Sequence, residues 1–206
     1  TTRTRTRASY GGNPYMENTV ENTVNAPDML YGNYMENYTA ERKTETDELP
    51  VTMHPMDFTY QVRYVFSHGL EYVALARGAL AGMAGAVWLN SGRTSEEAVT
   101  ILYDCSVEDF GAQACVHSFG IPDYPNEHST ARAERRYGLN LEVRLKNGKV
   151  TPFEFDVTYQ GAVQPQGGVS VVSGIEISDE DGTEGGSGFE VDVEDWGEYE
   201  DVELPL

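Results

Sequence analysis

The sequence predicts an all-β protein, folded as an antiparallel β-sandwich, and three observations lead to this prediction. Thirteen tyrosines, seven phenylalanines and many valines and threonines favour strands over helices. Glycine and proline make up 30 of the 206 residues and recur as turn signals between short apolar runs. Roughly seven to nine of these runs have the length and spacing of sandwich strands, and several alternate apolar with polar residues, which is typical of a strand with one buried face.

The segment 70–90 is the most apolar part of the chain and contains mostly small residues. Its length of about 20 residues would suit a membrane-spanning helix, but two charged residues and three interior glycines argue against one. Clustered small residues instead allow another backbone to approach closely. We therefore expect a buried strand over 71–80, a tight turn or short helical turn at 82–85 and a second strand through Trp88.

The other strands follow from the same alternation and from the turn residues between them. Asn147 and Gly148 predict a two-residue hairpin turn. Pro152 cannot donate a ladder hydrogen bond, so we expect the strand that begins at Val150 to lie at a sheet edge. Residues 106–113 are expected to form a connection. Strands are predicted at 56–66, 98–104, 114–119, 137–146, 150–158 and 169–177.

Three regions are predicted along the chain. Residues 1–49 are polar and irregular, which indicates an extension or the remnant of a preceding domain, and residues 50–178 form the sandwich. Residues 179–206 form an acidic, glycine-rich tail, expected to be flexible at its start, which either adds a final strand at 189–196 or stays mobile. No lysine or arginine follows Lys149, whereas the last 57 residues contain 15 acidic residues.

The net charge of −20 restricts the partners of this chain. Nucleic acid is excluded because phosphate binding needs a basic face, and direct contact with an anionic membrane is disfavoured for the same reason. The sequence shows no secretory segment, no lipoprotein cysteine near its start and no spanning helix. Because it begins abruptly, we expect that its targeting information is missing from this chain.

The residues that could perform chemistry do not form a recognisable site. No pair of carboxylates is fixed across a cleft, as a glycosidase would need, so we expect no catalytic residues and no enzyme activity. The acidic run 179–184 resembles a calcium loop, but it lacks the twelve-residue EF-hand frame and is better explained as a solvated linker. The four histidines have no ligand spacing. We therefore expect no metal and no cofactor.

Cys105 and Cys115 flank the connection expected at 106–113, and two alternatives are open for them. They could meet across a hairpin as a disulfide, which would add roughly 2 to 3 kcal/mol in an oxidising compartment, or both could be buried thiols. A nucleophilic role is disfavoured because neighbouring Asp104 and Glu108 would raise a thiol pKa.

Several short motifs resemble the fimbrillin superfamily of Bacteroidales surface proteins, in particular its uncharacterised lipoproteins that are akin to anchor-type accessory pilins. The motifs are Arg-Gly-Ala-Leu-Ala-Gly-Met-Ala at 77–84, Leu-Asn-Ser-Gly at 89–92, Ser-Phe-Gly-Ile-Pro at 118–122, Phe-Asp-Val-Thr at 155–158, the run 167–177 and the acidic ending 195–206. The resemblance covers residues 50–206. It implies a transthyretin-like Greek-key sandwich, the C-terminal domain of a two-domain, lipid-anchored surface protein whose relatives include pilins that assemble by donating a strand. The chain departs from this pattern because it contains no lipobox cysteine.

The resulting hypothesis is a non-enzymatic adhesin or accessory pilus (fimbrial) subunit at the cell surface, anchored to the outer membrane or extracellular. It would act through protein–protein contacts with other fimbrial or surface proteins, and reach a membrane only through a lipid anchor that this chain lacks. The expected contact residues lie on the edge strand and the tail: Val150, Phe153, Phe155, Phe189 and Trp196. The alternative is a carbohydrate-binding module that holds glycans on Trp88, Tyr124 and Trp196.

Overall fold

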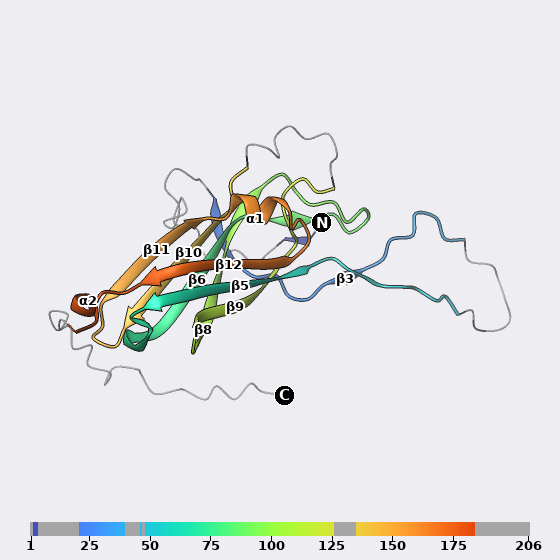
Figure 1. Ribbon diagram of the computed structural model, residues 1–206. Helices are drawn as coiled ribbons and strands as arrows, with labels where there is room; N and C mark the ends of the chain where they lie inside the picture. The colour runs from blue at the N-terminus through green and yellow to red at the C-terminus, as the bar shows by residue number, and fades with distance from the viewer. Residues whose placement is uncertain (1, 4–20, 40–45, 47, 126–134, 184–206) are drawn as a thin grey trace, which may run out of the picture.

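The computed structural model describes residues 2–3, 21–39, 46, 48–125 and 135–183. Figure 1 shows long strands that run side by side, with only short helices, so the predicted all-β class is confirmed. The long strands are β5 (Phe58–His68), β6 (Val73–Ala84), β8 (Ala98–Glu108), β9 (Gly111–Ser118), β10 (Gly138–Leu145), β11 (Val150–Asp156) and β12 (Gly168–Glu176). The short elements are β1 (Thr2–Arg3), β2 (Asn22–Asn25), β3 (Tyr31–Gly32), β4 (His54–Pro55), β7 (Ala86–Val87), the 3₁₀ turn η1 (Leu70–Tyr72), α1 (Thr158–Ala162) and α2 (Asp179–Thr183).

The long strands form two layers that share β8. One layer has the order β11, β10, β6, β8 and β2, and the other has the end of β8, then β9, β5 and β12. Residues 98–105 of β8 pair with β6, whereas residues 106–108 pair with β9. One strand therefore passes from the first layer into the second, which joins the two sheets covalently and through hydrogen bonds.

Among the strands that the structure describes, the pairing is antiparallel except at two places, which the sequence did not indicate. β12 lies parallel to β5, and β2 lies parallel to β8. The chain passes from β11 through α1 into β12. It then runs beside β5 in the same direction, and the two parallel strands are joined through the many elements that lie between them in the sequence.

The core lies between the two layers and is made of the alternating apolar side chains predicted from the sequence. Tyr60, Val62 and Tyr64 of β5 are buried, and they face Leu139, Leu141 and Val143 of β10 within one cluster. The Tyr64 hydroxyl donates to the backbone oxygen of Asn140 at 2.8 Å and lies 2.8 Å from the Tyr103 hydroxyl of β8. A side chain of one layer is thus hydrogen-bonded to two strands of the other.

The apolar segment 70–90 differs from its prediction. Instead of a turn at 82–85, β6 continues through Gly82 to Ala84, and the register shifts between Leu80 and Met83. Gly82 has a φ of +85°, and a Cβ there would lie 2.6 Å from the backbone oxygen of Arg136. The glycine thus forms a β-bulge with a close backbone approach, rather than a reversal of the chain.

Two predicted connections also differ. Residues 106–113 are not a loop, because β8 and β9 continue to a two-residue turn between Glu108 and Gly111. The hairpin after β10 exists, but its loop has three residues: Gly148 donates to the oxygen of Leu145, and Leu145 donates to the oxygen of Lys149. Gly148 has a φ of +86°, which is typical of a three-residue loop that ends in a left-handed glycine.

Part of the predicted polar extension lies inside the sandwich. Strand β2 pairs with residues 99–102 of β8, and Val24 is only 3% exposed within the main core. At the other boundary, Ile177 is buried in the same core and donates its N–H to the oxygen of His68. The sandwich therefore includes residues 22–25 in addition to the segment that begins at residue 50.

We expect Gly78→Ala to destabilise the protein by about 1 to 3 kcal/mol, as overpacking of a tight core does. A Cβ at Gly78 would lie 2.1 Å from the Tyr103 ring, and moving this ring would break its bond to Tyr64. Urea unfolding of the two proteins measures the difference. Gly92→Asn is the control, because Gly92 has open space around it and asparagine tolerates its φ of +69°. Equal stability of Gly78→Ala and the parent protein would contradict this account.

Candidate recognition surfaces

Strand β11 is one end of the first layer, as Pro152 predicted, and it pairs only with β10 among the described strands. Val150 is 50% exposed and available for contact. Phe153 and Phe155 are half-buried and packed against the core, with their rings stacked at 6.3 Å between centroids. Two of the predicted contact residues therefore hold the edge strand on the core, and only part of each ring faces outward.

The register of this hairpin shows which way the Pro152 nitrogen points. Leu145 and Lys149 form a hydrogen-bonded pair, and such pairs alternate with non-bonded ones along an antiparallel ladder. Pro152, opposite Glu142, thus occupies a non-bonded position, and its nitrogen faces the free edge. A strand that adds to β11 would find no N–H there, so Pro152 limits unspecific edge pairing.

The opposite edge, β12, is covered by two glutamine side chains from α1 and the loop after it. Val171 donates its N–H to Oε1 of Gln160 at 2.9 Å, and Nε2 of Gln160 donates to the oxygen of Val171 at 3.1 Å. Gln164 makes the same pair of bonds with Val169, where Nε2 lies 3.0 Å from the backbone oxygen. The two amides occupy the positions of a neighbouring strand and satisfy the outward backbone groups of Val169 and Val171, in the first half of β12.

We expect the double variant Gln160→Ala, Gln164→Ala to associate through β12, because its edge would lose these side-chain partners and an uncovered edge is a template for strand pairing. Sedimentation velocity should show a concentration-dependent rise in apparent mass that is absent from the parent protein. The control is Gln166→Ala, an exposed glutamine on the same loop that bonds neither Val169 nor Val171. A double variant that stays monomeric at all concentrations would show that the amides do not protect this edge.

The start of the acidic tail is a fixed helix rather than the flexible linker expected. Oδ1 of Asp179 lies 2.9 Å from Nε2 of His68 and accepts a 3.0 Å bond from the Tyr72 hydroxyl. Asp181 forms an ion pair with Lys149. These bonds lower the pKa of both carboxyls, and the bond to Asp179 raises the pKa of His68. Two of the carboxylates considered for calcium, Asp179 and Asp181, therefore attach α2 to the end of β5 and to the loop between β10 and β11.

The remaining predicted tail residues, Phe189 and Trp196, lie outside the described residues. Within the described ranges no three histidine, cysteine or acidic side chains lie close enough to hold a metal ion. Of the helices in the same ranges, none is long and apolar enough to cross a membrane.

Cys105 and Cys115 are free thiols, so the disulfide alternative is not formed in the structure. Cys105 packs against the core, whereas Cys115 lies between the core-facing Ala114 and Val116 and is exposed. Cys105 belongs to the part of β8 that pairs with β6 in the first layer. Successive residues of β9 point to opposite faces, so the thiol of Cys115 points away from the core. Burial raises the pKa of Cys105 to about 12.

We expect Cys115 to react with a thiol reagent such as Ellman's reagent at pH 8 in the native protein, whereas Cys105 reacts only after unfolding. The reactive species is the thiolate, which burial suppresses at Cys105. The measurement is the number of thiols titrated before and after addition of guanidinium chloride. Cys115→Ser should abolish the native reaction, and two fast native thiols, or none in either state, would contradict the assignment.

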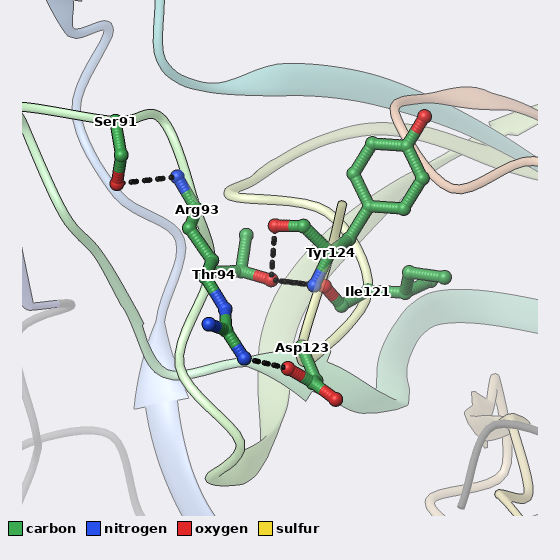
Figure 2. A network of polar contacts seen from close by, with 6 residues as sticks. All are labelled: Ser91, Arg93, Thr94, Ile121, Asp123 and Tyr124. Atoms are coloured by element: carbon green, nitrogen blue, oxygen red, sulfur yellow. Dashed lines mark hydrogen bonds and ion pairs between the residues drawn. The ribbon is translucent and has the colours of Figure 1, made fainter. Parts of the chain in front are cut away.

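The glycan alternative depended on three aromatic residues, which the structure does not bring together. Trp88 is exposed, whereas Tyr124 packs partly against the core, and Trp196 lies outside the described residues. Figure 2 shows that Tyr124 belongs to a structural network: Thr94 Oγ1 donates to the oxygen of Ile121 at 2.6 Å and accepts from the N–H of Tyr124 at 2.8 Å. Arg93 and Asp123 form an ion pair of 2.6 Å beside it. These contacts tie the loop after β7 to the loop after β9.

The structure also shows an exposed apolar surface that was not predicted from the sequence. Residues 29–39 and 48–55, here called the arm, run side by side away from the sandwich (Figure 1) and pair through β3 and β4. Eight large apolar side chains of the arm are between 46% and 71% exposed. They are Met29, Tyr31, Tyr34, Met35, Tyr38, Leu49, Val51 and Met53. The sequence signal was this run of tyrosine, methionine and aliphatic residues within an otherwise polar region.

The base of the arm is fixed by one buried carboxylate. Oδ1 of Asp57 accepts the N–H of Leu30 at 2.7 Å, and Oδ2 lies 2.8 Å from Nδ1 of His117 on β9. Met56 donates to the oxygen of Leu30 at 2.8 Å. The arm thus leaves the sandwich at a defined point beside the start of β5.

Comparisons with known proteins give one family and one solved structure. Residues 2–104 match the family described as "Domain of unknown function (DUF5119)". A crystal structure at 3.00 Å resolution of "a putative adhesin from Bacteroides ovatus" is similar, with a TM-score of 0.55 and 21% sequence identity, over 88% of this chain and 69% of that chain. No curated protein matches. At this identity the likeness shows a shared fold.

Proposed function

The chain belongs to the DUF5119 family, and from its exposed arm and free sheet edge we propose that it is a non-enzymatic cell-surface adhesin that binds other proteins. The finer form of this proposal is an accessory pilus subunit of the fimbrillin superfamily that is held at the outer membrane by a lipid anchor outside this chain. The fold shared with a protein described as a putative adhesin supports the proposal.

The observation that carries the proposal is the concentration of apolar side chains on the arm. Soluble monomers rarely expose contiguous apolar patches of more than a few hundred Å², and larger ones mark interaction sites. Here eight exposed apolar side chains lie on the narrow arm, whereas the apolar side chains of the core are buried between the two layers. Burying the arm against a partner would remove this surface from water.

The partner should be a protein rather than a polyanion. The arm has apolar side chains and two described acidic residues, Glu36 and Glu48, and its described part contains no lysine or arginine. Aromatic and methionine side chains of this kind are enriched at protein interfaces. Val150 and the outward side of β11 offer a second contact next to an edge where a partner strand can add.

The test is adhesion of beads coated with the protein to purified extracellular-matrix proteins and to isolated fimbrial subunits. We expect binding to at least one of them, and the variant Met35→Ser, Val51→Thr, Met53→Ser should weaken it by about tenfold or more. Each buried apolar side chain contributes roughly 1.5 to 3 kcal/mol, and a loss of 1.4 kcal/mol is tenfold in affinity.

The control variant is Tyr159→Ser, Val163→Thr, which removes two apolar side chains that are 83% and 63% exposed elsewhere on the protein. It should bind like the parent protein. Binding that survives the arm variant, or that disappears when the targets are deglycosylated, would count against protein recognition by the arm.

A further inference from the structure

A cleft of about 420 Å³ lies where the base of the arm meets the sandwich. Its walls come from three parts of the structure: residues 32–34 and 54–55 of the arm with the adjoining Met56, residues 89–92 of the loop after β7, and Gln166 of the loop before β12. Phe58 completes its apolar side. Its volume falls within the roughly 300 to 1,000 Å³ typical of small-molecule sites. We propose that this cleft is a binding site for a neutral glycan.

The lining combines aromatic and apolar surface with neutral polar groups. Tyr34, Phe58 and Leu89 offer flat or apolar faces, against which the C–H groups of a sugar ring can pack. Asn33, Asn90 and Gln166 carry carboxamides, and each carboxamide can donate and accept hydrogen bonds. A sugar hydroxyl also donates and accepts, so the two sets of groups are complementary.

Part of this polar surface is free to bind. Among the described residues, the structure gives the side chains of His54, Asn90 and Gln166 no hydrogen-bond partner, and all three are exposed. Asn33, in contrast, donates to the oxygen of Thr52 and helps to hold the arm. The cleft therefore presents two unused carboxamides and one imidazole around an apolar floor.

The charge of the lining selects against ionic ligands. Charged residues make up 23% of the sequence, yet none of the described residues that line the cleft is a lysine, arginine, aspartate or glutamate. Phosphate or carboxylate groups would need basic partners, which are absent from this lining. The net charge of −20 further disfavours an anion. An uncharged ligand rich in hydroxyls is the class that fits.

The walls of the cleft are held in place before any ligand binds. In the loop after β7, Gly92 donates to the oxygen of Trp88 at 2.8 Å, and Trp88 donates to the oxygen of Arg93 at 2.8 Å. Arg93 is fixed by Asp123, and Ser91 accepts the N–H of Arg93, as Figure 2 shows. The loop before β12, which contributes Gln166 to the cleft, is held in place because Ile121 donates its N–H to the oxygen of Pro165 at 3.1 Å. Preorganisation of this kind lowers the cost of binding.

The test uses an array of mannose-, galactose-, glucose- and N-acetylglucosamine-terminated glycans, with sialylated and sulfated glycans as the charged set. We expect binding to at least one neutral glycan, with chemical-shift changes at the side-chain amides of Asn90 and Gln166. Tyr34→Ala and the double variant Asn90→Ala, Gln166→Ala should each weaken binding by about tenfold or more, because an unpaired sugar hydroxyl or a lost stacking face costs on the order of 1.4 kcal/mol.

The matched control is Trp88→Ala, which removes an exposed aromatic side chain next to the cleft that does not line it. This variant, and the variant Met35→Ser, Val51→Thr, Met53→Ser, should bind the glycan like the parent protein, which separates this site from protein recognition by the arm. The proposal is overturned by no binding on the array, by preference for the charged set, by loss only in Trp88→Ala, or by binding that survives Asn90→Ala, Gln166→Ala.

Discussion

The hydroxyl of Tyr64 connects the two layers of the sandwich by hydrogen bonds, and the packing of the core depends on the distance between these layers. It donates to the backbone of β10 and is bonded to Tyr103 on β8, so three strands meet at one buried oxygen. Burial raises the pKa of both tyrosines, which keeps both protons in place for this chain of bonds. This arrangement also requires a glycine at position 78, because the ring of Tyr103 fills the space that a side chain would occupy there. A buried, fully bonded pair of this kind specifies one spacing of the layers.

This constraint acts in the interior of the sandwich, whereas the parts of its periphery differ from one another in chemistry. The β12 edge is covered by glutamine amides, the β11 edge is limited by Pro152, and the arm exposes apolar side chains. The lining of the cleft at the base of the arm combines apolar side chains with neutral polar ones. An adhesin with these features would combine an apolar contact on the arm with a small site at the base of the arm, and Tyr34 would belong to both. Because the arm base is fixed by Asp57, these two surfaces have a defined relation to each other.

The features that could be predicted from the sequence are those with local causes. The alternation in β5 and β10 shows which side chains are buried, and the turn residues at 147–148 indicate the hairpin, because both effects act between neighbouring residues. The parallel position of β12 and the insertion of β2 depend on contacts between distant segments, which no local pattern records. The bulge at Gly82 follows from a backbone that approaches from residue 136. The edge at Val150 was predicted from Pro152, whereas the cleft was not, because its three walls come from separate parts of the chain.

The parallel pairing of β5 and β12 determines how the sandwich would respond to a mechanical load. The arm enters β5 at Phe58, and β12 ends at Glu176 beside the far end of β5, next to α2. A tensile load between the arm and α2 would therefore act along the axes of the two strands and in opposite directions. The eight paired positions from Gly168 with Tyr60 to Glu176 with His68 would then resist sliding together, instead of separating one after another as in a hairpin opened from its end. This geometry resists mechanical extension along the line that joins the arm to the end of β12.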